Sequence, residues 1–238
     1  MSLRSAGRSL VDGRFSADAV LLELFMEVNV TSLLNMSIEL GKCYPIFIVD
    51  EPNNDGARFG GKPPLGVKPA HADKFTEYFL TLPWDNEQEV SIFFSFSPAD
   101  PVRSSWANAR KVHDARSSLI EVVLHPKAPR ASSDRLASSL LPRNLRIEAP
   151  IHDVYRGEAF LRYPYHKLGG RPFFRDAGSP GYESTGQLIT EGYSHILQMS
   201  FPTDHDAKIG GSWPFGEMEF HMFAIKQGKK THFRCYWA

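Results

Sequence analysis

Histidine and aspartate side chains gather in the last quarter of the chain, where they could bind a metal ion or transfer protons. The set consists of His195, Asp204, His205, Asp206 and His221. Imidazole and carboxylate groups are ligands of zinc and related ions, and they also serve as general acids and bases. Their spacing matches no compact metal motif, and residues 204–206 lie in a polar stretch where charged side chains are usually only solvated. We therefore predict no metal and no cofactor, and we retain a metal-dependent or hydrolase-like enzyme as the alternative function.

An aromatic run follows this polar stretch and offers a different kind of site. Trp213, Pro214 and Phe215 form a rigid apolar segment. Such residues supply a large contact area at low entropic cost, so they are typical anchors of protein interfaces. The segment is therefore a candidate binding surface for a protein partner. Packing of the same rings into the core is the other interpretation, and the sequence leaves both open.

Motifs for nucleophilic catalysis and for phosphate binding are absent from the sequence. No Gly-x-Ser-x-Gly elbow occurs, and pairing Cys43 or Cys235 with a distant histidine has no distinctive spacing. Three diglycine pairs lack the spacings of phosphate loops. These glycines are predicted to form tight structural turns, and they are Gly60, Gly61, Gly169, Gly170, Gly210 and Gly211.

The end of the chain alternates basic and aromatic residues, a combination that can bind nucleic acid. A hairpin around Gly228 and a final core strand explain the same residues. Lys plus Arg total 27 and Asp plus Glu total 27, so the formal net charge is zero. Without a long-range field toward phosphate, nucleic acid is disfavoured as a partner. A non-catalytic binding or protein-interaction module is thus the leading functional hypothesis.

The sequence also predicts where the protein resides. The longest apolar window, 19–30, contains Glu23 and Glu27 and is too short to span a bilayer, so we predict no membrane insertion. Cys43 and Cys235 lie far apart and fit thiols of a reducing compartment better than a disulfide framework. A soluble protein of the cytoplasm is expected.

Periodic patterns indicate a helix near the start and strands thereafter. Residues 1–15 are expected to be flexible, and apolar residues from Val20 to Val28 follow helical spacing. Strands are predicted at 44–49, 90–96, 119–124 and 145–148, and two more flank the polar and aromatic stretch after position 194. The segment 128–142, rich in Ser, Arg and Pro, is the best candidate for a linker.

One short pattern occurs twice and indicates an internal duplication. A basic residue, an apolar residue, two glycines, a basic residue and a proline occupy 58–63 and again 167–172. Each copy precedes an apolar strand that ends in a proline. We therefore predict one domain spanning 16–238, with related halves at about 44–127 and 143–238.

Four blocks follow one another along the chain, namely Arg58 to Pro63, Tyr165 to Phe174, His195 to Met199 and Gly211 to Met218. In this order the blocks resemble the YwqG-like family, whose function is unknown. The resemblance implies a mixed α and β fold with an internal duplication, and no established activity. Where the family has an acidic cluster after Leu-Gln, this chain has Ser200 to Asp204, so a function that needs those carboxylates is not carried over. The expected fold is α+β: a β-rich body of two related halves, with an N-terminal helix packed on a sheet.

Overall fold

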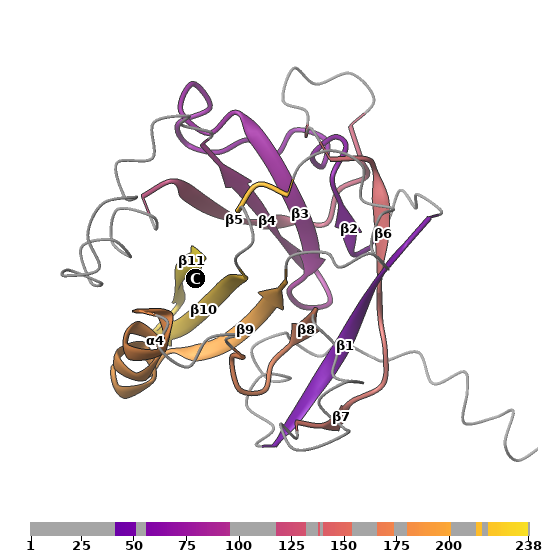
Figure 1. Cartoon of the computed structure of the whole chain (residues 1–238). Helices are drawn as coiled ribbons and strands as arrows, with labels where there is room; N and C mark the ends of the chain where they lie inside the picture. The colour runs from indigo at the N-terminus through magenta and orange to yellow at the C-terminus, as the bar shows by residue number, and fades with distance from the viewer. Residues whose placement is uncertain are drawn as a thin grey trace, which may run out of the picture.

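A computed structural model describes most of the chain after residue 40. The described residues are 41–50, 56–95, 118–131, 138, 140–153, 166–173, 180–200, 213–215 and 219–237. They form eleven strands and one helix (Figure 1). The strands are β1 (Lys42–Val49), β2 (Arg58–Phe59), β3 (Glu77–Pro83), β4 (Gln88–Phe94), β5 (Ile120–Pro126), β6 (Arg143–Ile147), β7 (Ile151–His152), β8 (Lys167–Leu168), β9 (Ser194–Met199), β10 (Phe220–Gln227) and β11 (Lys230–Trp237), and the helix is α4 (Pro180–Thr190).

All eleven strands belong to one antiparallel sheet that curls around a single core (Figure 1). The strand order is β11-β10-β9-β8-β1-β6-β2-β3-β4-β5, and β7 pairs with β1 beside this path. The two terminal strands, β5 and β11, come into contact across the remaining gap. The sheet is therefore a nearly closed barrel.

The sheet consists of two five-strand series that repeat the same pairing. One series runs β6-β2-β3-β4-β5 and the other runs β1-β8-β9-β10-β11. The two series exchange their first strands. β1 precedes β2 in the chain but pairs with β8 of the other series. β6 precedes β8 in the chain but pairs with β2. The series meet where β1 and β6 pair, with Phe47 opposite Arg146 at the centre.

Matching irregularities support this correspondence between the two series. In β3, Phe79 is skipped in the pairing with β4, and in β9, Ile196 is skipped in the pairing with β10. The amide of Gly60 donates to the carbonyl oxygen of Phe79 at 2.8 Å, and the amide of Gly169 donates to that of Ile196 at 2.8 Å. A bulge bends a strand and increases its local twist. Both series therefore bend at the same place, and each bend is tied to a diglycine turn.

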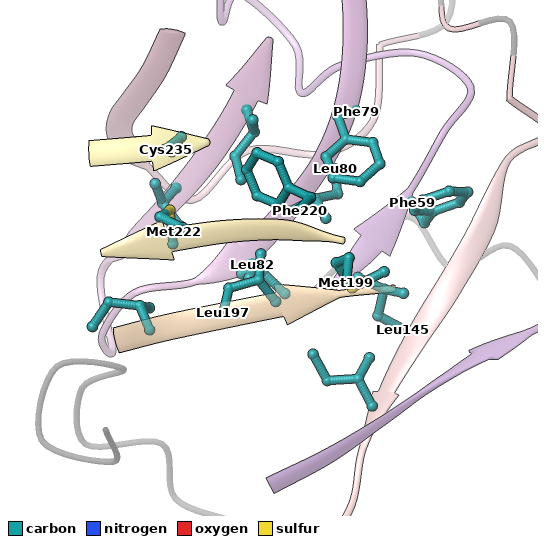
Figure 2. Close-up of a cluster of buried hydrophobic side chains, with 14 of the residues drawn as sticks. Phe59, Phe79, Leu80, Leu82, Leu145, Leu197, Met199, Phe220, Met222 and Cys235 are labelled. Atoms are coloured by element: carbon teal, nitrogen blue, oxygen red, sulfur yellow. The ribbon is translucent and has the colours of Figure 1, made fainter. Parts of the chain in front are cut away.

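The core lies on the inner face of the barrel and includes Phe79 of β3 (Figure 2). The Phe79 ring makes edge-on contacts with other rings at centroid distances of 5.1–6.2 Å, namely Phe59, Phe94, Trp213, Phe215 and Phe220. Edge-to-face pairs contribute about 0.5–1.5 kcal/mol beyond the burial of their area. Strand β3 supplies Phe79 itself, and β2, β4 and β10 supply three of its five ring partners, so this cluster binds the two series together.

The helix α4 lies between β8 and β9 in the chain and contacts β9. It begins at Pro180, a residue favoured at the first helical position. It ends in a Schellman motif: Gly192, at a φ of 89°, donates to the carbonyl of Ile189, and Tyr193 donates to that of Leu188. These bonds direct the chain back onto the sheet at β9.

The expected α+β class is wrong, because the described chain is almost entirely sheet. Several strands were too short or too irregular for their periodicity to predict them. β2, β7 and β8 have two residues each, and the bulge at Phe79 interrupts the alternation of β3. The predicted N-terminal helix, at 20–28, and the predicted flexible segment, at 1–15, lie outside the described residues. The four strands predicted between 44 and 148 are confirmed with shifted ends.

Within the part of the chain that the structure describes, no helix has the length and apolar character that crossing a membrane requires.

Candidate functional site

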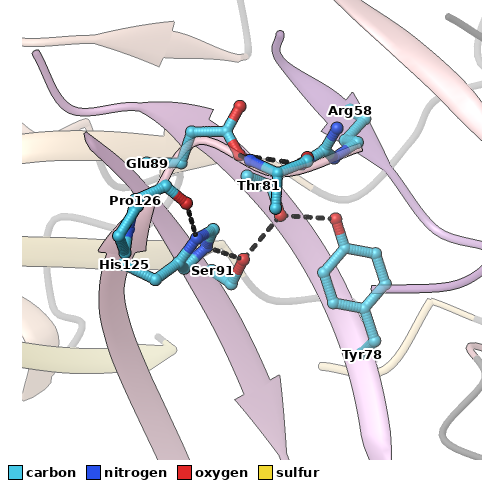
Figure 3. Close-up of polar contacts among 8 residues, drawn as sticks. Arg58, Tyr78, Thr81, Glu89, Ser91, His125 and Pro126 are labelled. Atoms are coloured by element: carbon cyan, nitrogen blue, oxygen red, sulfur yellow. Dashed lines mark hydrogen bonds and ion pairs between the residues drawn. The ribbon is translucent and has the colours of Figure 1, made fainter. Parts of the chain in front are cut away.

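A chain of four side chains crosses the outer face of β3, β4 and β5 in the first series (Figure 3). Tyr78 Oη lies 2.7 Å from Thr81 Oγ1, which lies 2.7 Å from Ser91 Oγ. Ser91 Oγ in turn lies 2.7 Å from His125 Nε2, and His125 Nδ1 lies 2.7 Å from the carbonyl oxygen of Pro126. Consecutive antiparallel strands bring these residues together, since Thr81 faces Ser91 in the register of β3 and β4. We call these four side chains the relay.

The carbonyl at the end of the relay determines the direction of every hydrogen bond in it. A carbonyl oxygen only accepts, so His125 Nδ1 carries the proton and His125 Nε2 is an acceptor. Ser91 then donates to His125, Thr81 donates to Ser91, and Tyr78 donates to Thr81. Hydrogen bonds that point the same way polarise and strengthen one another. The Ser91 hydroxyl thus points at a neutral imidazole, which is the geometry of a nucleophile and its base.

Burial controls the protonation of both ends of the relay. Removal from water lowers the pKa of His125 below its usual 6.5, which keeps the ring neutral. Burial also raises the pKa of Tyr78 to about 12, so its hydroxyl retains its proton. Ser91 is fully buried and His125 is 7% exposed. At the Tyr78 end, the relay adjoins a second apolar cluster, to which the segment before β3 contributes Val67 and Phe75.

An ion pair lies beside the relay at the first diglycine turn (Figure 3). Arg58 Nη2 donates to Glu89 Oε2 at 2.8 Å and to the carbonyl oxygen of Ala128 at 2.7 Å. Both side chains are buried, with 0% and 3% of their surface exposed. A buried ion pair requires good geometry to offset its desolvation. The pair ties β2 to β4, and the Ala128 carbonyl adds the chain after β5.

A corresponding polar cluster occupies the outer face of the second series. His195 Nδ1 lies 3.2 Å from the carbonyl oxygen of Gly170, so this nitrogen donates and His195 Nε2 accepts. His221 Nδ1 lies 3.5 Å from His195 Nε2 and is the donor of that contact. Tyr236 Oη forms a hydrogen bond with Thr185 of α4. Burial lowers the pKa of His195 to about 3, with the nearby Lys167 ammonium as the second cause, so the ring is neutral.

Lys167 takes the place in this series that Arg58 has in the first. Its Nζ lies 3.2 Å from Asp153 Oδ1 and also donates to the carbonyl oxygen of Arg171. Burial lowers the pKa of Lys167 to about 8, although Asp153 and the thiol of Cys43 act in the opposite direction. Lys167 and Asp153 are 0% and 1% exposed. Each series thus encloses one basic side chain from its diglycine block and pairs it with one carboxylate.

The structure brings together two of the five polar residues that the sequence singled out. His195 and His221 face one another, with ring centroids 5.6 Å apart. Asp204, His205 and Asp206 lie outside the described residues. Among the described residues, no group of three or more His, Cys, Asp or Glu side chains could hold a metal ion.

The structure places the aromatic run in the core. Trp213 is 6% exposed and Phe215 is 4% exposed, and both rings contact Phe79. Pro214, between them, is half-buried. This is the inward packing that the sequence left open beside a binding surface.

Four of the six predicted turn glycines lie in the described chain. Gly60, Gly61, Gly169 and Gly170 have φ values of 60°, 69°, 67° and 68°, a region that favours glycine. A Cβ on Gly60 would lie 2.4 Å from the carbonyl oxygen of Leu141. All four glycines therefore lie in left-handed backbone at tight turns. Gly210 and Gly211 lie outside the described residues.

Sequence reasoning missed the relay and both ion pairs. One signal for the relay was present, because Ser91 belongs to the polar face of an alternating strand, and His125 directly follows the next predicted strand, at 119–124. The basic residue that opens each diglycine block was noticed only as part of a pattern. A basic residue directly before a buried turn, repeated in both halves, indicates a structural ion pair.

Comparisons with known proteins give no relative: neither a protein-family model, nor a curated protein, nor a solved structure matches the chain.

Proposed function

We propose that the protein is a non-catalytic binding module that engages a protein partner in the cytoplasm. The observation that carries this proposal is how the described side chains divide between interior and surface. The side chains of the two polar clusters described above that could do chemistry are enclosed, with 0–7% exposure, namely Ser91, His125, Lys167, His195 and His221. Large apolar side chains stand in solvent, with 41–59% exposure, namely Phe47, Leu65, Leu141, Ile151 and Ile189.

Phe47 illustrates the exposed side of this division. It lies in the middle of β1, which pairs with β6, yet 45% of its surface is exposed. The guanidinium of Arg146 lies 5.6 Å from its ring centroid. Arg and aromatic residues are enriched among the side chains that carry binding energy at interfaces.

The proposed location is supported by Cys43 and Cys235, which are buried thiols and thus suited to a reducing compartment. Membership of the YwqG-like family remains part of the proposal.

Site-specific photo-crosslinking in cells tests the binding function. Benzoylphenylalanine replaces Phe47 in one variant and Lys229 in another; Lys229 is exposed in the β10–β11 turn and serves as the matched control. We expect a discrete crosslinked product at Phe47 and none at Lys229, because an interface traps the probe in place. The proposal fails if the probe at Phe47 gives no product, or gives the same products as the probe at Lys229.

A hydrolase-like activity is the second candidate function, and the Ser91–His125 pair favours it. The 2.7 Å contact, with Pro126 orienting the imidazole, has the order nucleophile, base and orienting group. Full burial of Ser91 opposes it, because a substrate has no access to this hydroxyl in the structure. Labelling with a fluorophosphonate, which reacts with activated serine hydroxyls, distinguishes the two functions. Covalent labelling of the unmodified chain that is lost in Ser91→Ala would establish Ser91 as a nucleophile. Absence of labelling would support the binding module.

A further inference from the structure

The two terminal strands of the barrel, β5 and β11, each have one edge without a partner strand (Figure 1). β5 pairs only with β4, and β11 pairs only with β10. The two strands come into contact, yet no ladder of hydrogen bonds joins them. An open strand edge is a template on which another extended chain can add. We call these two facing edges the seam.

Hydrogen bonds at both ends of β5 show which of its backbone groups face the seam. The amide of Ser95 donates to the carbonyl oxygen of Leu119 at 2.9 Å, and the amide of Lys127 donates to that of Glu87 at 3.0 Å. Bonding directions alternate along an antiparallel strand. The odd-numbered residues of β5 therefore bond toward β4, and the even-numbered residues point toward the seam.

Val122 and Leu124 are the seam-facing residues in the middle of β5. Within the described chain, their outward N–H and C=O groups bond to no strand and no side chain. Residues 121–124 are all partly exposed, whereas 89–94 on the neighbouring β4 are all buried, so solvent reaches this edge. The side chains of Val122 and Leu124 pack against the core. The edge thus combines unpaired backbone groups with accessible apolar side chains.

The hairpin turn determines which residues of β11 face the seam. Gly228 has a φ of 62°, which suits the first position of a two-residue type II′ turn. Gln227 and Lys230 flank this turn and pair with each other, so they form the closing hydrogen-bonded pair. Thr231 and Phe233 therefore point their backbone groups toward the seam.

Ring contacts in the core show how the two edges are aligned. The ring centroid of Phe233 lies 5.3 Å from that of Trp84, next to the β3–β4 turn, where β5 ends. Phe215 contacts both Trp237 and Phe94, and Phe94 pairs with the first residue of β5. β11 therefore runs along β5 in the opposite direction. The β10–β11 turn lies beyond the end of β5 and outside the seam.

Positive charge on the outer side of the seam has no counter-ion. His232 and Arg234 are exposed and alternate with the core-facing Phe233, so they lie on the outer face of β11. Arg234 forms no ion pair within the described chain. Glu121, the acidic residue of β5, accepts a hydrogen bond from the amide of Ala70 instead. Acidic side chains on an added strand would therefore complement this face.

We infer that the seam binds an extended segment of another protein in which apolar residues alternate with acidic ones. The apolar side chains would pack onto Val122, Leu124 and Phe233, and the acidic ones would face Arg234. Main-chain hydrogen bonds to β5 supply affinity, and the alternating side chains supply specificity. Where β5 and β11 touch, the segment separates them, and no hydrogen bond opposes this movement. Phe47 lies on β1, in the middle of the strand order, so the seam is a second surface beyond the proposed function.

Amide NMR of the full chain tests the inference with short peptides. The probes are acetyl-Glu-Val-Glu-Val-Glu-amide, its counterpart with lysine in place of glutamate, and the glutamate peptide with N-methylated valines. The glutamate peptide should shift the amide resonances of Val122 and Leu124 saturably and slow their hydrogen exchange several-fold, because these amides become donors in a ladder. The lysine peptide and the N-methylated peptide should leave both amides unchanged.

Three variants accompany this titration. Val122→Pro removes one seam-facing donor and should weaken binding several-fold; an edge strand tolerates proline where the N–H faces solvent. Arg234→Gln should also weaken binding several-fold. Lys68→Gln is the matched control, because Lys68 is an exposed basic residue between β2 and β3, and it should bind as the unmodified chain does. If Val122→Pro fails to fold, Arg234→Gln and the peptide comparison on the unmodified chain still decide.

Any of four results would overturn the inference. These are no saturable shift with the glutamate peptide, an equal shift with the lysine or N-methylated peptide, protection of both amides before any peptide is added, and an equal shift with a thymidine oligonucleotide. Protection without peptide would mean that another segment already pairs with β5, and the oligonucleotide result would assign Arg234 to nucleic acid.

The crosslinking experiment separates this inference from the proposed function. Crosslinking at Phe47 that persists while the peptides fail would remove only the seam. Peptide binding without crosslinking would retain the seam and remove the surface around Phe47.

Discussion

Buried side chains on the outer face of the sheet predict how the stability of the protein depends on pH. His195 is neutral because burial and Lys167 hold its pKa at about 3, against 6.5 for an ordinary histidine. At pH values between about 3 and 6.5, this histidine is protonated in the unfolded chain and neutral in the folded chain. The free energy of unfolding should therefore fall as pH decreases from 6.5 toward 3, by about 1.4 kcal/mol per pH unit.

Urea unfolding of the unmodified chain and of His195→Gln across this pH window measures the effect. The difference between the two curves isolates His195, because His125, whose pKa shifts the same way, is present in both proteins. Parallel curves would mean that the imidazole is solvated and that the enclosed cluster is wrongly described.

The hydrogen bonds of the relay predict how much stability the protein loses when Ser91 is replaced. Ser91→Ala removes the acceptor of the Thr81 hydroxyl and the donor to His125 Nε2. Buried polar groups that lose their partners cost about 1–3 kcal/mol each, so the loss of two should lower the free energy of unfolding by about 2–6 kcal/mol. Thr190→Ala is the control, since its hydroxyl bonds to Gly186 on the exposed face of α4, and it should change stability by about 0.5 kcal/mol or less. Equal effects of the two substitutions would contradict the relay.

Secondary-structure elements depend on the diglycine turns that precede β3 and β9. Gly60→Ala should destabilise the protein more than Gly66→Ala, although both residues have positive φ, 60° and 76°. At Gly66 the added Cβ meets nothing within 4 Å, whereas at Gly60 it meets backbone at 2.4 Å. Gly66→Ala, the control, should therefore lower the free energy of unfolding only by the strain of the left-handed conformation, about 1–2 kcal/mol. Melting temperatures of the two variants give the comparison, and equal values would show that the turn can move away.

Prediction from sequence worked best for the longer strands, which are rich in apolar residues. Alternation with a period of two predicted β4 and β6, whereas β-branched and aromatic composition predicted β1 and a nearly continuous apolar run predicted β5. β2 and β8 have two residues each and carry no period, although their diglycine sequences indicated the turns that follow them. Of the candidate site, the pairing of His195 with His221 depends on the register of β9 and β10, and register is set by packing that sequence alone does not show.

The molecule as a whole is held together by the exchange of β1 and β6 between the two series. A protease site introduced within 132–137 should allow the chain to be cut while the two pieces remain associated. β1, on the first piece, pairs with β6 and β8 on the second, and Phe79 packs against Phe220 across the same division. Size-exclusion chromatography should show one species of unchanged size after cleavage. Separation of the pieces without denaturant would contradict the exchanged pairing.

The exchange of β1 also has a consequence for synthesis on the ribosome. Tyr44 leaves the ribosome long before Leu168, its partner in β8, has been made. At about 5–20 residues per second, the 124 residues from 44 to 168 take about 6–25 s. Throughout that time β1 lacks this neighbour, and its apolar residues are exposed to other nascent chains. Chaperones that bind apolar segments should therefore meet this protein early, and rapid translation should improve its yield.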